Sequence, residues 1–184
     1  SPRFVDENKW GTFYSVSGRW NIERESFMEG SVFNMLKLRA SYGTTGNQSI
    51  GGLNLTKELY ASGNGYNDED SYGLAQLGNE KLKWETVTQT NVGVDFGIKN
   101  NKFSGKVDLY RKVTTDLFQP TYISAINGLT QLTTSNFGSM ENRGIELTLN
   151  WHAIKNQDGF NLYLRGNGAY NESEINDVPT FDGK

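Results

Sequence analysis

Apolar and polar residues alternate along most of this chain with a period of two residues. In the segment 91–98 every odd position is polar or glycine, and every even position is apolar: Val92, Val94, Phe96 and Ile98. The segment 144–151 shows the same pattern with the apolar residues at odd positions: Ile145, Leu147, Leu149 and Trp151. Successive side chains of a β-strand point to opposite faces of the sheet, so this alternation predicts strands with one apolar and one polar face.

Similar alternation in other segments predicts an all-β fold of antiparallel strands. We expect six strands, at Trp10–Ile22, Leu36–Thr45, Trp84–Ile98, Phe103–Phe118, Arg143–Ile154 and Phe160–Glu172. Helix is expected only for about one turn within Glu23–Phe33, because the apolar residues there lack a 3.6-residue period.

The connections between these strands alternate between short and long. Residues 99–102 and 155–159 form tight polar turns, whereas residues 46–83 and 119–142 form long loops. Outer-membrane β-barrels have short periplasmic turns and long extracellular loops. We therefore expect 46–83 and 119–142 to be extracellular loops and the two short turns to be periplasmic. We also expect the apolar residues that alternate along each strand to face lipid.

Composition excludes several other classes of protein. The chain has 184 residues, a net charge of -3, one histidine and no cysteine. A basic nucleic-acid footprint, a disulfide scaffold and the usual zinc ligand sets are therefore not expected. No apolar run is long enough for a transmembrane helix. The mean hydropathy of -0.62 fits a barrel, whose lumen is polar.

Six strands are too few to close a transmembrane barrel, because the smallest have about eight and lipid does not tolerate open sheet edges. We therefore expect residues 1–184 to be a partial barrel domain, without the closing strand or a plug domain. Two alternatives stay open. One is a soluble β-sandwich module that binds carbohydrate, which would be monodisperse without detergent. The other is a barrel that only scaffolds a surface complex, which uptake assays would separate from a transporter.

Four segments, in order, resemble the SusC/RagA family of TonB-dependent outer-membrane transporters. They are WGTFYSVSGRW (10–20), LKLRASYGTTGNQ (36–48), LKWETVTQTNVGVD (82–95) continuing to VDLYRK (107–112), and NFGSMENRGIEL (136–147). Together these segments contain 56 of the 184 residues. Tyr14 departs from the family pattern, which often has proline at that position.

The resemblance implies a large (about 22-stranded) transmembrane β-barrel plugged by an N-terminal domain. It implies a multi-pass protein of the bacterial outer membrane, in contact with its lipid, which imports nutrients such as oligosaccharides or peptides and is not an enzyme. It also implies two partners. One is a SusD-like surface lipoprotein that caps the barrel, and the other is the TonB–ExbB–ExbD system, contacted through an N-terminal region outside this sequence.

Candidate substrate-binding residues are the aromatic side chains of the two long loops, because aromatic faces stack on sugar rings. They are Tyr60, Tyr66 and Tyr72 in the first loop and Tyr122 in the second. Packing on a neighbouring loop or on the lipoprotein is the alternative role for these rings.

The acidic segment 67–73 resembles part of a calcium-binding loop, with Asp68 and Asp70 as candidate ligands. The EF-hand pattern requires glutamate at its twelfth position, which Asn79 occupies here. A solvated loop tip is therefore the alternative, and we expect no bound metal. The glycine-rich segment 43–52 lacks the Gly-Lys-Ser/Thr ending of a phosphate loop, and no catalytic arrangement is found, so neither a cofactor nor a catalytic residue is expected.

Overall fold

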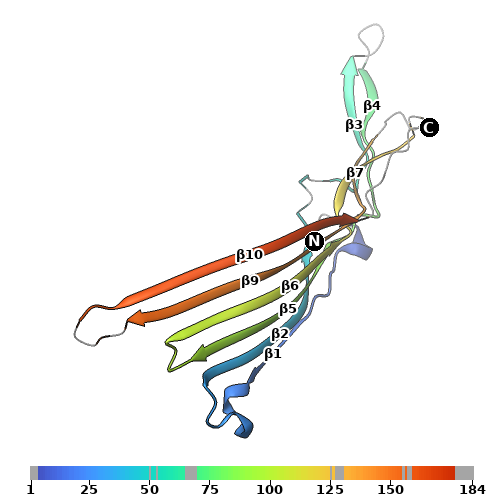
Figure 1. Ribbon diagram of the computed structural model, residues 1–184. Coiled ribbons are helices and arrows are strands. Elements are labelled where there is room, and N and C mark those ends of the chain that lie inside the picture. Colours follow the sequence, from blue (N-terminus) through green and yellow to red (C-terminus); the bar gives the residue numbers. More distant parts are fainter. Residues whose placement is uncertain are drawn as a thin grey trace.

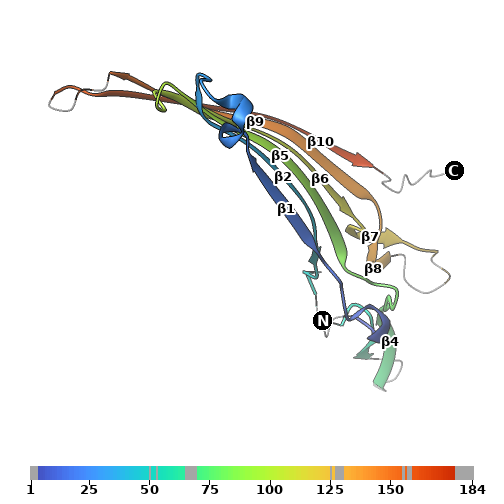
Figure 2. The same ribbon diagram turned by 90° about the horizontal axis from the view of Figure 1, so that it is seen from below.

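The computed structural model describes residues 4–49, 51–52, 54–64, 70–124, 126, 131–154, 156 and 159–176. These residues form one long, curved sheet of six antiparallel strands, with two short hairpins at one end (Figures 1 and 2). In spatial order the strands are β1 (Ser15–Asn21), β2 (Phe33–Asn47), β5 (Glu85–Ile98), β6 (Phe103–Thr115), β9 (Ser139–Ile154) and β10 (Leu162–Asn176). The predicted all-β fold with antiparallel strands is confirmed.

The two hairpins lie within the segments that we expected to be loops. They pair β3 (Leu59–Asn64) with β4 (Asp70–Gln76), and β7 (Phe118–Tyr122) with β8 (Gln131–Asn136). Figure 1 shows β3 and β4 projecting away from the end of the sheet. The alternation missed the first hairpin because two neighbouring pairs on one of its faces consist of small residues, Ala61 opposite Gly73 and Gly63 opposite Ser71.

Three complete single turns of 3-10 helix are found among the described residues: η1 (Asp6–Asn8), η2 (Ile22–Arg24) and η3 (Ser26–Met28). The last two lie in or beside the segment where we expected one helical turn. β1 begins at Ser15, later than predicted, and β2 begins earlier and ends later than predicted. Within the described residues, no helix has the length and apolar character needed to cross a bilayer.

The strand register collects the apolar residues of neighbouring strands into common rows. Val94 lies opposite Leu38 on one side and Val107 on the other, and Val107 in turn lies opposite Leu147. Parallel rows contain Val92, Leu109 and Ile145, and Ile98, Phe103 and Trp151. Paired residues point to the same face of a sheet, so the apolar residues that the sequence predicted to share a face do share one.

The turn between β5 and β6 explains how this register is set. Lys99, Asn100 and Asn101 have positive φ angles of 50°, 53° and 58°. Asparagine tolerates this left-handed conformation better than most residues. The Lys102 amide donates to the Lys99 carbonyl at 3.1 Å, which closes the turn and fixes Ile98 opposite Phe103.

A small apolar core lies at the other end of the sheet, beneath the hairpins. Its buried side chains are Phe4, Leu55 and Leu82, and Trp84 and Phe118 pack against them. The ring centroids of Phe4 and Trp84 are 5.8 Å apart, and the Trp84 indole N–H donates to the Asn8 carbonyl at 3.1 Å. Trp84 and Phe118 therefore help to close the core at this end of the sheet.

Polar contacts fasten the β7–β8 hairpin to this core. The carboxylate of Glu85 accepts hydrogen bonds from the Phe118 amide at 2.7 Å and from Asn47 Nδ2 at 2.6 Å. The Asn136 side-chain amide donates to the carbonyls of Lys83 and Asp116, both at 2.8 Å. The base of the β7–β8 hairpin is therefore held against the end of the long sheet.

Candidate functional site

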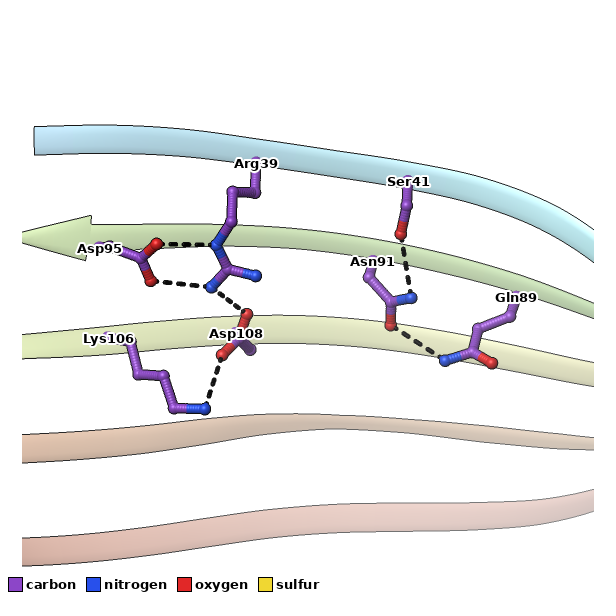
Figure 3. Close-up of polar contacts among 7 residues, drawn as sticks. All are labelled: Arg39, Ser41, Gln89, Asn91, Asp95, Lys106 and Asp108. Atoms are coloured by element: carbon purple, nitrogen blue, oxygen red, sulfur yellow. Dashed lines mark hydrogen bonds and ion pairs between the residues drawn. The ribbon is translucent and has the colours of Figure 1, made fainter. Parts of the chain in front are cut away.

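The polar face of the sheet carries a network of charged side chains from three adjacent strands. Arg39 of β2 donates from Nε and Nη2 to the two carboxylate oxygens of Asp95 on β5, both at 2.9 Å (Figure 3). The same Nη2 donates to Asp108 of β6 at 2.8 Å. Lys106 adds a longer contact, 3.8 Å, to the second oxygen of Asp108. One guanidinium thus joins three strands.

The register and one glycine make this network possible. Arg39 and Asp108 lie in the same row, with Gly93 of β5 between them. A Cβ atom at Gly93 would collide with Asp108 Oδ1 and would lie 2.7 Å from Arg39 Nη2. The arginine side chain therefore crosses the middle strand over a residue that has no side chain. Because a guanidinium presents its donors in a planar fork, it can pair with both carboxylates at once.

A second set of polar contacts continues along the same face toward the hairpin end (Figure 3). Asn91 Nδ2 donates to the Ser41 hydroxyl at 3.2 Å, and Gln89 Nε2 donates to Asn91 Oδ1 at 3.3 Å. Ser41 and Asn91 also line a hollow of about 440 Å³ beside Arg19 and Arg39. This face is therefore a wall that offers hydrogen-bond donors and acceptors to a polar surface or solute.

Cations exceed anions on this wall. Four basic residues on this face form no ion pair with any described residue: Arg19, Lys37, Lys112 and Arg165. Glu146 of β9 is an acidic residue in the same row as Asp108. Within the Arg39 network the charges balance, because it joins two cations to two carboxylates. Among the described residues no group of three or more His, Cys, Asp or Glu side chains is placed to hold a metal ion.

The structure brings two of the four candidate tyrosines together. Tyr60 lies opposite Leu74 and Ser62 lies opposite Tyr72, so the two tyrosines share one face of the β3–β4 hairpin as diagonal neighbours. Their side chains are 64% and 74% exposed. Tyr122 is at the end of β7, in the other hairpin, and its side chain lies outside the described residues, as does all of Tyr66.

The calcium candidates are only partly described. Asp70 is the first residue of β4, opposite Asn64 of β3. Asp68 lies outside the described residues. The prediction of a solvated acidic loop tip therefore stays a prediction.

The alternation along the chain places Arg39, Asp95 and Asp108 among the polar positions of their strands, but it does not show that they pair. The signal in the sequence that could have indicated the pairing was the presence of opposite charges at alternate positions of adjacent predicted strands. The pairing itself depends on register, which the alternation alone does not determine. A glycine between two charged positions of the same predicted face would have been the additional clue.

The opposite face is apolar near the short turns and charged toward the hairpins. Arg111 lies at one of the alternate positions of β6 that point to this face, and it pairs with Glu141 at 2.8 and 2.7 Å. Arg143 pairs with Glu172 at 3.1 and 3.0 Å. These ion pairs follow directly on the row of Val92, Leu109 and Ile145. One face of the sheet thus carries charged residues along its length, whereas the other face carries them only beyond an apolar band.

Known proteins are similar to this chain over almost its whole length. Residues 2–184 match the family model described as TonB dependent receptor-like, beta-barrel. The chain is 37% identical over 182 residues to the TonB-dependent receptor SusC of Bacteroides thetaiotaomicron, covering 95% of this chain and 18% of the relative. It is also 37% identical over 184 residues to the TonB-dependent receptor P39 of Formosa agariphila, covering 100% of this chain and 17% of that relative.

Solved structures give the same result. The RagAB peptide importer in its open-open state superposes with a TM-score of 0.85 and 35% identity, covering 100% of this chain and 20% of that one. The closed-closed state of the same importer gives a TM-score of 0.83 and 34% identity, over 96% of this chain and 19% of that one. The chain therefore spans less than a fifth of the length of these curated relatives.

Proposed function

Because the chain belongs to the TonB-dependent receptor β-barrel family, we propose that it forms part of the wall of an outer-membrane importer that takes up peptides or oligosaccharides. The observation that carries this proposal is the two-faced sheet. Arg39, Asp95 and Asp108 lie on one face at the same level as Val94 and Val107 on the other. A barrel wall between a polar lumen and lipid requires this arrangement, because a charge facing lipid at the bilayer midplane costs about 2–4 kcal/mol.

The direction of the wall follows from the connections. The hairpins β3–β4 and β7–β8 extend from one end of the sheet, and the tight turn 99–102 lies at the other. We place the hairpin end outside the cell and the tight turns in the periplasm, in keeping with the loop asymmetry of outer-membrane barrels. The long connections 46–83 and 119–142 are then the extracellular loops.

The extracellular end is where substrate and a lid would first contact the wall. Tyr60 and Tyr72 present two exposed rings on one face of the β3–β4 hairpin. We assign them to contact with incoming substrate or with a SusD-like surface lipoprotein. At the base of this hairpin, Gln76 Nε2 donates to the carbonyls of Asn54 and Lys57 at 3.0 and 3.2 Å, next to Leu55 of the small core.

Import of this kind needs energy. We assign the supply of this energy to the TonB–ExbB–ExbD system, which would act through a plug domain in the N-terminal part of the complete protein. This role makes the protein a transporter component and not an enzyme. The name of the RagAB importer favours peptides as one substrate class, so peptides and oligosaccharides both belong in the test.

The test uses the full-length protein in its own cells. Uptake of a labelled peptide mixture and of labelled oligosaccharides is measured in the wild type, in a deletion strain and in the deletion strain carrying the restored gene. We expect at least one substrate class to lose uptake on deletion and to recover it on restoration. A protonophore, which removes the energy for TonB, should abolish the same uptake. Equal uptake of both classes in all strains would refute the transport role and favour a barrel that only scaffolds a surface complex.

A further inference from the structure

A shallow, open groove of about 580 Å³ lies on the apolar face of the sheet, near the hairpin end. Its floor is one row of side chains from four adjacent strands: Val92, Leu109, Ile145 and Tyr170. These side chains are between 40% and 66% exposed, so no described part of the chain covers them. The next row toward the hairpins supplies the rim, which is formed by Arg111, Arg143 and Glu172.

The rim presents positive charge to the groove. Arg111 and Arg143 lie directly opposite each other on β6 and β9. Their side chains are 62% and 58% exposed, whereas Glu141, the partner of Arg111, is only 19% exposed and does not line the groove. Two guanidinium groups and one carboxylate, that of Glu172, therefore line the groove, and Glu174 lies in the next row toward the hairpins.

The arginines also keep donors available. Each one directs Nε and Nη2 toward its glutamate. Among the described residues Nη1 of each arginine forms no hydrogen bond. The glutamates hold the two planar groups in fixed orientations, and an oriented guanidinium binds a phosphate through parallel hydrogen bonds.

The level of the rim matches a lipid headgroup. Arg111 lies eight residues along β6 from Phe103, which is beside the tight turn. At about 3.4 Å per residue and a tilt of about 35–45°, this separation corresponds to a height of roughly 19–22 Å. The apolar band of an outer-membrane barrel is about 25 Å tall. Because arginine side chains extend toward the interface, the two guanidinium groups would reach the headgroup level of the outer leaflet.

We propose that this groove binds a phosphorylated lipid of the outer leaflet, with an acyl chain on the apolar floor and a phosphate at the arginine rim. The inference rests on the proposed function, because it requires the apolar face to be in lipid and the hairpins to be outside. It adds a specific lipid site to a surface that would otherwise contact the bilayer without selectivity.

The test measures lipid binding to the full-length protein after delipidation in detergent. The probe is lipid A, a phosphorylated glycolipid, and native mass spectrometry counts the molecules bound. The double variant Arg111→Gln/Arg143→Gln should weaken binding by about tenfold or more, since it removes both charged donors. The control Lys112→Gln/Arg165→Gln removes two charges from the same sheet but from its polar face, and should bind as the wild type does.

Two further arms separate lipid from free phosphate. Ile145→Trp fills the floor and leaves the rim intact, so it should reduce binding of lipid A. Dephosphorylated lipid A should bind the wild type as weakly as lipid A binds the arginine variant, and inorganic phosphate at the same concentration should not displace lipid A. Three results would each overturn the proposal. They are displacement of lipid A by inorganic phosphate, binding of dephosphorylated lipid A to the wild type as tight as that of lipid A, and binding of lipid A to the arginine variant as tight as to the wild type.

The outcome is independent of the transport test. The arginine variant should still support uptake, because the rim is on the face opposite the polar wall. Loss of lipid selectivity with uptake retained therefore supports the lipid site. If nitroxide labels at Val94 and Leu147 prove to be in water, the membrane orientation itself is wrong and both proposals fail. If the labels are in lipid but the arginine variant binds lipid A normally, only the lipid site fails.

Discussion

Replacing Arg39 with methionine tests the polar network directly. The change removes three hydrogen bonds to carboxylates and leaves Asp95 and Asp108 as neighbours without a shared cation. Breaking a buried ion pair costs about 3–5 kcal/mol, whereas an exposed pair contributes about 0–1 kcal/mol. The Arg39 side chain is 37% exposed and the two aspartates are 24% and 22% exposed. We therefore expect a loss of about 2 kcal/mol, between these limits.

The measurement is urea unfolding of the full-length protein in lipid vesicles, together with hydrogen exchange of β5 and β6. Lys37→Met is the matched control, because Lys37 lies on the same strand and face and forms no ion pair with any described residue. A double-mutant cycle of Arg39→Met with Asp108→Asn isolates the pair, for which we expect a coupling of about 1 kcal/mol. Faster exchange in β5 and β6 should accompany the loss of stability, because these strands carry the aspartates.

One result would refute the reasoning. If Arg39→Met and Lys37→Met have the same stability and the same exchange rates, the network does not join the three strands. Gly93→Ala provides a second approach, since its Cβ would lie where Arg39 and Asp108 meet. It should reduce stability although it removes no charge.

Three further predictions concern the membrane and the size of the folded unit. Nitroxide labels at Val94 and Leu147 should be accessible to oxygen and shielded from a water-soluble relaxation agent, and the reverse accessibility would contradict the lipid-facing assignment. A tag at Asn67 should be labelled on intact cells and a tag at Asn101 should not, whereas labelling at Asn101 alone would invert the topology. Residues 1–184 expressed alone should not give a monodisperse, cooperatively unfolding monomer in plain buffer, because among the described residues the outer edges of β1 and β10 are unpaired and the core has three buried apolar side chains. Size exclusion and circular dichroism would detect such a monomer, which would favour the soluble sandwich.

The main strands could be predicted from the sequence because their alternation reflects two different surroundings. Segments such as 91–98 have a polar and an apolar neighbour on their two faces, so burial and charge impose a period of two. The hairpins β3–β4 and β7–β8 project from the sheet and do not separate two such surroundings. Their sequences therefore lack the contrast, and the alternation did not predict these strands within the two long connections.

The candidate site was less predictable than the fold. Parity assigned Arg39, Asp95 and Asp108 to one face, but their contacts depend on which residues lie opposite each other. The register of β5 and β6 follows from the geometry of the 99–102 turn, and the contact also requires a glycine at the crossing point. Similarly, Tyr60 and Tyr72 were candidates only as loop aromatics, and their common face follows from a hairpin that the sequence did not reveal.

The distribution of charge between the two faces also bears on the soluble sandwich. In a sandwich, a second sheet covers the apolar face and buries it at core density. Here Val92, Leu109 and Leu147 are 40%, 51% and 39% exposed, and no described strand packs against that face. Both two-stranded sheets lie at the hairpin end, where the small core is. An apolar surface several strands wide, bounded at one end by ion-paired arginines, is what a lipid bilayer covers without any further protein layer. The exposure of these side chains therefore favours the membrane over a second sheet.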